Sequence, residues 1–297
     1  MASFFDEIAK NRLKSIVLLA LFCGLFSLII FVFVLLLGGG LFAFLIGFLL
    51  VLVYAFISYY YGSKLVLKMS GAQPADRSTY AMLYEVVEGL ASASLISMPA
   101  VYVINTPNPN AFATGKNKKS ASIAVTTGLL SMMDKRELEG VIAHEMSHIY
   151  NNDIQYLLIA TVFAGVIGLV AAALRMMFFF GGLRGGRNSG IIGLIALVIG
   201  LLAPLFALLL KFAISRKREY MADANGGRIT RDPEGLADAL RKIQAYSSGK
   251  TAQPVMTANE ITASLYFANP LSMRSMSNLF STHPPIEERI KRLEAMH

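Results

Sequence analysis

Four long apolar segments constrain most strongly how this chain can fold. Residues 16–37 contain no charged side chain, and as an α-helix they would be about 33 Å long. Three glycines separate them from a second uncharged segment at residues 41–61, and two more apolar segments follow at residues 154–180 and 191–210. The pattern predicts four transmembrane helices in two hairpins. A cleaved signal peptide is the disfavoured alternative for the first segment, because its apolar stretch is too long and a second span follows at once.

The composition also indicates contact with lipid. Hydrophobic residues make up 55% of the 297 residues and charged residues 15%, whereas soluble domains average roughly 45–50% and 25%. A soluble globule could not bury that much apolar surface, so part of it must face a bilayer. The single cysteine, Cys23, lies in an apolar segment, which excludes a disulfide-stabilised secreted domain and a thiolate zinc site. Any metal must therefore be held by nitrogen and oxygen ligands.

The net charge of +8 reflects basic residues near the ends of the apolar segments. Lysines and arginines gather at residues 10–14, 64–68 and 211–218, which share one side of the membrane if all four segments cross it. That side is expected to be cytoplasmic, in a multi-pass protein of the cell inner membrane. We therefore expect the lipid bilayer, and no nucleic acid, as a partner. Arg184 and Arg187, between the third and fourth segments, would then lie outside, so full crossing by the second hairpin stays open.

The remaining chain is polar enough to fold in water. We expect an N-terminal hairpin at residues 1–63, a first soluble part at 64–153, a second hairpin at 154–210 and a second soluble part at 211–297. The two soluble parts must come together beside the membrane. Hydrophobic periodicity and turn signals predict a helix, two short strands and another helix in the first part, at residues 79–94, 101–104, 122–126 and from Asp134 onward.

The last of these helices carries two histidines four positions apart. His144 and His148 project from one face of a helix at this spacing, so both imidazoles can hold one Zn²⁺. Glu145 stands beside the first ligand, where its carboxylate can take a proton from a zinc-activated water. Two of the chain's four histidines lie in this segment. The pattern predicts a catalytic zinc site with Glu145 as general base.

A catalytic zinc site needs a third protein ligand. The candidates are Asp153, Glu219, Asp223 and His283. Glu219 and Asp223 are four apart on a predicted helix, so one could bind zinc while the other accepts the free N–H of a ligating imidazole. The spacing alone equally allows a solvated acidic pair.

Four ordered motifs together resemble one family. They comprise the HExxH motif followed by Asp153, and three stretches at residues 108–115, 215–224 and 281–290. With the two hydrophobic hairpins, they resemble the HtpX-type membrane zinc endopeptidases, an HExxH family that includes the CAAX prenyl proteases. The fold class that this implies is α+β: a mostly helical, zincin-like catalytic domain with a small β-sheet, plus four transmembrane helices.

The resemblance also assigns residue roles. It implies Glu219 as the third zinc ligand and Asp223 as the hydrogen-bond partner of a ligating imidazole. Asp153 either hydrogen-bonds the ligand-bearing helix or marks where that helix meets the headgroups. His283 either donates to the reaction's oxyanion, or gates the metal, or belongs to a helix cap. In this family the stretch at Asn110, Ala111 and Phe112 resembles an edge strand that binds extended substrate; a turn-rich loop is the alternative.

We therefore expect an integral membrane zinc endopeptidase with one Zn²⁺ per subunit. Because the HExxH helix runs into the third apolar segment, the zinc should lie near the membrane surface, which suits membrane-protein substrates. The resemblance implies quality-control proteolysis of damaged membrane proteins, as in a stress response. The alternatives are a transporter or scaffold with a structural zinc site, and a narrow processing or prenyl-protein protease. The oligomeric state stays open.

Overall fold

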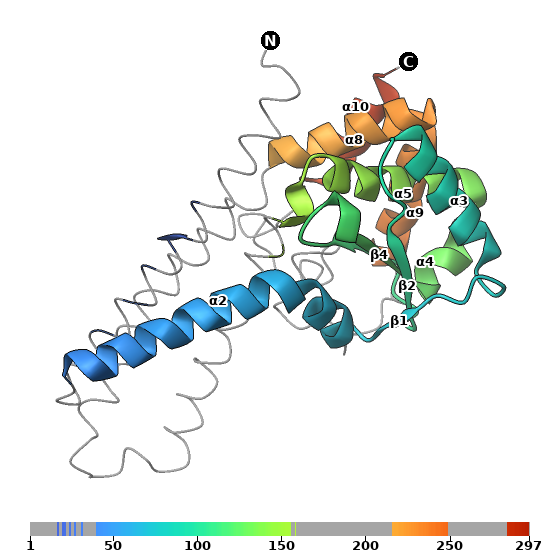
Figure 1. The fold of residues 1–297 in the computed structure, drawn as a ribbon. Helices are drawn as coiled ribbons and strands as arrows, with labels where there is room; N and C mark the ends of the chain where they lie inside the picture. Colours follow the sequence, from blue (N-terminus) through green and yellow to red (C-terminus); the bar gives the residue numbers. More distant parts are fainter. Residues whose placement is uncertain are drawn as a thin grey trace, which may run out of the picture.

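A computed structural model describes residues 40–155, 158, 216–248 and 284–296, together with six separate positions between residues 17 and 31. Almost all of the predicted first span and of the second hairpin at residues 154–210 lies outside these residues, as does His283. Figure 1 shows one long helix, α2, reaching away from a body of helices and strands.

Helix α2 (Leu41–Met69) contains the predicted second span and continues beyond it. Large apolar side chains along it are exposed, among them Leu41 at 74% and Phe42 at 78%. Within the part of the chain that the structure describes, no single helix is long and apolar enough to cross a membrane. The two halves of α2, Leu41–Tyr54 and Phe56–Met69, meet at a bend of 42°. Together they could cross a membrane by length and composition.

A small mixed sheet follows α2. Its strands lie in the order β1-β2-β4-β3, with β2 and β4 parallel and the two outer pairs antiparallel. The predicted strands at residues 101–104 and 122–126 are confirmed as β2 and β4. The four strands are β1 (Ala72–Pro74), β2 (Ala100–Ile104), β3 (Ala111–Thr114) and β4 (Ser122–Thr126). Among the described strands, β3 therefore has a neighbour on one side only.

Helices make up most of the body, as expected for a mostly helical α+β domain. The predicted helices at residues 79–94 and after Asp134 are confirmed as α3 and α5. The helices are α3 (Ala81–Ala93), α4 (Thr127–Met132), α5 (Lys135–Tyr150), α8 (Arg216–Thr230), α9 (Pro233–Ser248) and α10 (Ile286–Glu294), with a 3₁₀ turn at Lys118–Ser120.

Helix α5 is the centre of the core. A capping box starts it: the Glu137 amide donates to Asp134 Oδ1 at 2.9 Å, and the Asp134 amide donates to Glu137 Oε2 at 2.9 Å. Helices α3, α8 and α9 and strand β3 pack around it. Gly140 allows α9 to approach closely, because a Cβ there would lie 2.6 Å from the Leu236 amide nitrogen. The apolar residues after α5's polar start thus become the buried face on which the site is built.

Candidate metal centre

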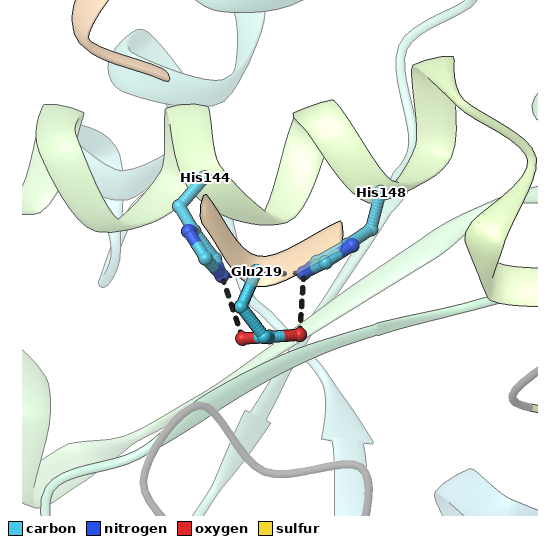
Figure 2. Close-up of side chains that lie close together, drawn as sticks. All are labelled: His144, His148 and Glu219. Carbon is cyan, nitrogen blue, oxygen red and sulfur yellow. Dashed lines mark hydrogen bonds and ion pairs between the residues drawn. The ribbon is translucent and has the colours of Figure 1, made fainter. Parts of the chain in front are cut away.

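His144 and His148 present their imidazoles together, as the helical spacing predicts. Their ring centroids are 4.8 Å apart and their Nε2 atoms 3.2 Å apart. Both rings project from α5 toward the same point (Figure 2). The side chains are 1% and 8% exposed, so solvent cannot compete strongly for these nitrogens.

Glu219 enters from α8 and faces both rings. Its Oε2 lies 3.7 Å from His144 Nε2, and its Oε1 lies 3.6 Å from His148 Nε2. Figure 2 shows the carboxylate across the tips of the two imidazoles. One ligand atom from each residue falls within 4.8 Å of the others. Helix α8 therefore supplies a third donor to the pair on α5, across 71 residues of sequence.

These donors suit zinc. Zn²⁺ binds imidazole nitrogen and carboxylate oxygen at about 2.0–2.2 Å, so neighbouring ligand atoms of a tetrahedral site lie about 3.4 Å apart. The distances of 3.2, 3.6 and 3.7 Å between the three donors bracket that value. Three protein ligands leave one coordination position for water, which is typical of catalytic zinc sites.

Each imidazole also meets a carboxylate through its other nitrogen. His144 Nδ1 lies 2.9 Å from Asp223 Oδ1, and His148 Nδ1 lies 3.1 Å from Asp153 Oδ2. A carboxylate can only accept at neutral pH, so each Nδ1 donates its proton, and Nε2 offers a lone pair to a metal when the imidazole is neutral. The two aspartates named from the sequence therefore reach the imidazoles, one from α8 and one from just after α5.

Two arginines lie behind the aspartates. Arg289 of α10 donates to both oxygens of Asp223, from Nε at 2.9 Å and from a terminal nitrogen at 2.7 Å. Arg218 lies 3.7 Å from Asp153 Oδ1. Sequence reasoning missed both. The signal for Arg289 was present, because it stands on the apolar side of the amphipathic terminal helix, beside Ile290.

The charged groups around the histidines favour a dication. Four carboxylates and two guanidinium groups give the buried surroundings a formal charge of −2 when the imidazoles are neutral. Buried charge of one sign is stable only when it is paired or coordinates a metal. The groups are Glu145, Asp153, Glu219, Asp223, Arg218 and Arg289.

The pKa shifts follow from burial and from these neighbours. Burial lowers the pKa of His144 to about 4, against the opposing hydrogen bond to Asp223. Burial also lowers the pKa of His148, but the hydrogen bond to Asp153 and the surrounding carboxylates outweigh it and raise that pKa to about 9. Burial acts to raise the pKa of Asp223, whereas the charge of Arg289 and the hydrogen bond to His144 lower it to about 2. The region around His148 therefore attracts positive charge.

The other predicted residues lie close to this centre or outside the described chain. Glu145 follows His144 on α5 and is 3% exposed. Asn110 precedes β3, which packs against α5. Ala111 and Phe112 are in β3; the Phe112 side chain is fully buried on the face of the sheet that meets α2. The structure thus brings the predicted ligands, Glu145 and the β3 strand into one region.

A zinc metallopeptidase is the class of protein that this donor set and its helical scaffold define. Residues 77–297 match the family model of Peptidase family M48, and the chain belongs to that family. It is 45% identical over 294 residues to a Protease HtpX homolog from Dictyoglomus thermophilum, across 99% of this chain and 95% of the relative. It is 46% identical over 286 residues to another from Caldanaerobacter subterraneus subsp. tengcongensis, across 93% of each.

Among solved structures, the fold is similar to the crystal structure of S. mikatae Ste24p. The TM-score is 0.48 at 17% identity, over 98% of this chain and 67% of that one. The relatives and the family model confirm the predicted HtpX resemblance, the metallopeptidase class and the zinc cofactor.

Proposed function

We propose that this chain is an integral membrane endopeptidase that cleaves membrane proteins close to the bilayer surface. The observation that carries the proposal is the attachment of the exposed apolar helix α2 to the strands beside the metal centre. Val66 and Leu67 at the end of α2 pack with Phe112 of β3 and with Leu158, which follows α5. Gln155 also donates to the Tyr59 hydroxyl at 3.2 Å. A bilayer around α2 would therefore lie next to the catalytic centre.

In the reaction that we propose, the metal supplies a Lewis acid and the protein supplies the group that carries the proton. Zinc, when held by His144, His148 and Glu219, supplies a Lewis acid that activates water and polarises the scissile carbonyl. Glu145 accepts the proton of the attacking water and later gives it to the leaving amine. Its near-complete burial supports this role, because a carboxylate on the buried face of α5 exchanges the proton with the reacting groups and not with bulk water.

Asp223 and Asp153 orient the ligands in this proposal. Each accepts the Nδ1 proton of one imidazole, at 2.9 and 3.1 Å. This interaction fixes the tautomer that leaves Nε2 free for the metal. Because Asp153 is turned to His148 in this way, it does not act as a fourth ligand. Within the described chain three donors converge, which supports a catalytic site over the structural site of a transporter or scaffold.

Strand β3 is proposed to bind substrate in extended form. The Thr126 amide donates to the Asn110 carbonyl at 2.9 Å, and antiparallel pairs alternate between bonded and unbonded positions. Phe112 and Thr114 therefore bond to β4, whereas the backbone of Ala111 and Ala113 faces the other edge. The Ala111 amide donates to Asn110 Oδ1 at 3.0 Å, so a substrate strand would use the Ala111 carbonyl and both groups of Ala113. Such backbone recognition gives weak sequence selectivity.

The proposal also includes four spans in the inner membrane, with the catalytic domain on the cytoplasmic side. The proposed role is protein quality control. Residues 1–63 and 154–210 form its two hairpins, and residues 64–153 and 211–297 its catalytic parts. The basic segments at the hairpin ends support this orientation. His283 is proposed to donate to the oxyanion or to gate the metal, since it stands six residues before Arg289, which reaches the centre.

Full-length protein in vesicles tests the proposal. The same cleavable sequence is offered in a soluble unfolded protein and next to a transmembrane helix in the same vesicles. We expect the membrane-tethered form to be cut faster, and Glu145→Gln to keep zinc while losing cleavage of both. Glu139→Gln, on the same helix, is the matched control and should cleave normally. Equal rates on both substrates would contradict membrane selectivity without touching the metallopeptidase assignment.

A further inference from the structure

Arg289 is a charged residue on the buried side of the amphipathic helix α10, where apolar residues are expected. It is 1% exposed, and its side chain is the largest of the fully buried ones among the described residues. Its neighbours on α10, Lys291 and Arg292, are exposed. Removing a guanidinium group from water is costly unless it is fully paired. The buried guanidinium group of Arg289 must therefore be paired with specific partners.

The pairing of Arg289 leads directly to a zinc ligand. Its Nε and one terminal nitrogen bind the two oxygens of Asp223, at 2.9 and 2.7 Å. The same terminal nitrogen lies 3.3 Å from His144 Nδ1. Asp223 Oδ1 is thus the common acceptor for two donors, the guanidinium group and the imidazole N–H at 2.9 Å. The carboxylate cannot rotate away from one donor without losing the other.

We propose that Arg289 is a positioning residue for zinc: it locks the Asp223 carboxylate, which in turn holds the His144 imidazole with Nε2 directed at the metal. The geometry explains why an arginine stands here. A guanidinium group presents two parallel N–H donors that match a carboxylate, whereas a lysine ammonium binds one oxygen at a time.

The contact joins three helices at one carboxylate. His144 is on α5, Asp223 on α8 and Arg289 on α10, and 145 residues separate the first from the last. Helix α10 also packs on α9 through its apolar side, which includes Leu293. Docking of the C-terminal helix and the zinc affinity of the HExxH helix are therefore coupled through Arg289. A chain with α10 undocked would bind zinc more weakly even with all three ligands present.

The test is the zinc dissociation constant of the full-length protein in detergent, measured by competition with a chelator. Arg289→Met should weaken zinc binding by roughly 10- to 100-fold, the usual effect of losing a partner that orients a metal ligand. Arg289→Lys keeps the positive charge but loses the pair of parallel N–H donors, so its zinc dissociation constant should lie between those of the wild type and Arg289→Met. Lys291→Met removes a positive charge from the exposed side of α10 and should bind zinc as the wild type does.

Two further variants separate positioning from a general loosening of α10. Leu293→Ala should lower the melting temperature of the metal-free protein while changing the zinc dissociation constant less than about threefold, since it creates a cavity away from the site. Asp223→Asn should weaken zinc binding on its own, and adding Arg289→Met to it should cost little more.

Three results would overturn the inference. One is zinc binding by both Arg289 variants with wild-type affinity. Another is a loss of affinity in Leu293→Ala as large as that in Arg289→Met. The third is an equal further loss when Arg289→Met is added to Asp223→Asn, because the arginine would then act independently of that carboxylate.

Discussion

Gly226 of α8 lies against the backbone of His144 on α5. A Cβ atom at position 226 would be 3.1 Å from the His144 amide nitrogen and 3.4 Å from its Cα. Glu219, Asp223 and Gly226 follow one another at helical spacing along the side of α8 that faces α5. The glycine thus sets the distance at which both carboxylates meet the imidazoles.

Enlarging this glycine should weaken the metal centre. Gly226→Ala must push α8 outward by a few tenths of an ångström, because its Cβ would meet backbone atoms. We expect a loss of about 1–2 kcal/mol in the free energy of unfolding, as for modest overpacking, together with weaker zinc binding. Urea unfolding and chelator competition measure the two effects. Gly89→Ala, where nothing lies within 4 Å of the new Cβ, is the control and should not weaken either property. Unchanged zinc affinity in Gly226→Ala would show that the helix spacing is not critical.

Removal of the metal should inactivate and destabilise the protein. Chelation is expected to stop cleavage and lower the melting temperature, and added Zn²⁺ should restore both. At zinc concentrations 1,000 times the dissociation constant, binding adds about 4 kcal/mol to stability. Glu219→Ala should lose this zinc-dependent rise in melting temperature, whereas Glu234→Ala on α9 should keep it. If Glu219→Ala retained a full equivalent of zinc, its assignment as a ligand would be wrong.

Zinc affinity should increase with pH. In the metal-free protein the pKa of His148 is raised to about 9, so zinc must displace a proton from it at lower pH. The apparent affinity should rise up to tenfold per pH unit between pH 7 and 9. The stability of the metal-free protein should move the opposite way. Its His148 contribution is fully present below pH 6.5, the pKa expected when unfolded, and is lost as the pH rises through 9.

Chelators of known proton affinity and thermal unfolding with and without zinc measure these two trends. Because other groups titrate over the same range, His148→Gln is the reference for the stability of the metal-free protein. A pH-independent affinity between pH 7 and 9 would contradict the raised pKa of His148.

The capping box of α5 should contribute to the free energy of unfolding, because α5 lies at the centre of the core. Asp134→Ala removes the acceptor for the Glu137 amide at 2.9 Å. We expect a loss of about 1 kcal/mol in the free energy of unfolding. Zinc content at saturating metal should not change, because the cap lies ten residues before His144. Differential scanning calorimetry and metal analysis check both points. A loss of zinc at saturation would mean that the cap controls the geometry of the ligands.

The edge of β3 that has no neighbouring strand within the described chain can be tested through one amide. Ala113→Pro removes an N–H that faces away from β4, and proline is tolerated where a strand's N–H is not part of the ladder. We expect a several-fold fall in kcat/KM for peptide cleavage with an unchanged zinc dissociation constant. Glu139→Gln on α5, outside the strand and the metal centre, is the comparison and should leave kcat/KM nearly unchanged. Normal cleavage by folded, zinc-bound Ala113→Pro would exclude this edge as the substrate strand.

Local sequence patterns predicted the elements that carry the site. Helical spacing placed His144 and His148 on one face, and the Asp134–Glu137 pair located the start of α5. Turn residues next to short apolar runs located β2 and β4. Strand β1 and helices α4 and α9 were not predicted, because the first two are short and α9 lies in a stretch without a motif. Glu219 and Asp223 could not be told apart by spacing, and only the family resemblance favoured Glu219 as the ligand.

What the sequence alone determined is therefore local: the apolar segments, the HExxH helix and the nitrogen and oxygen chemistry of the metal site. Each follows from periodicity within one element or from the residue types available. Tertiary structure decided which carboxylate of α8 faces both Nε2 atoms and which faces Nδ1. It also decided that Arg289 closes the site from the far end of the chain. These contacts depend on how three helices pack, and packing joins positions whose separation in sequence carries no periodic signal.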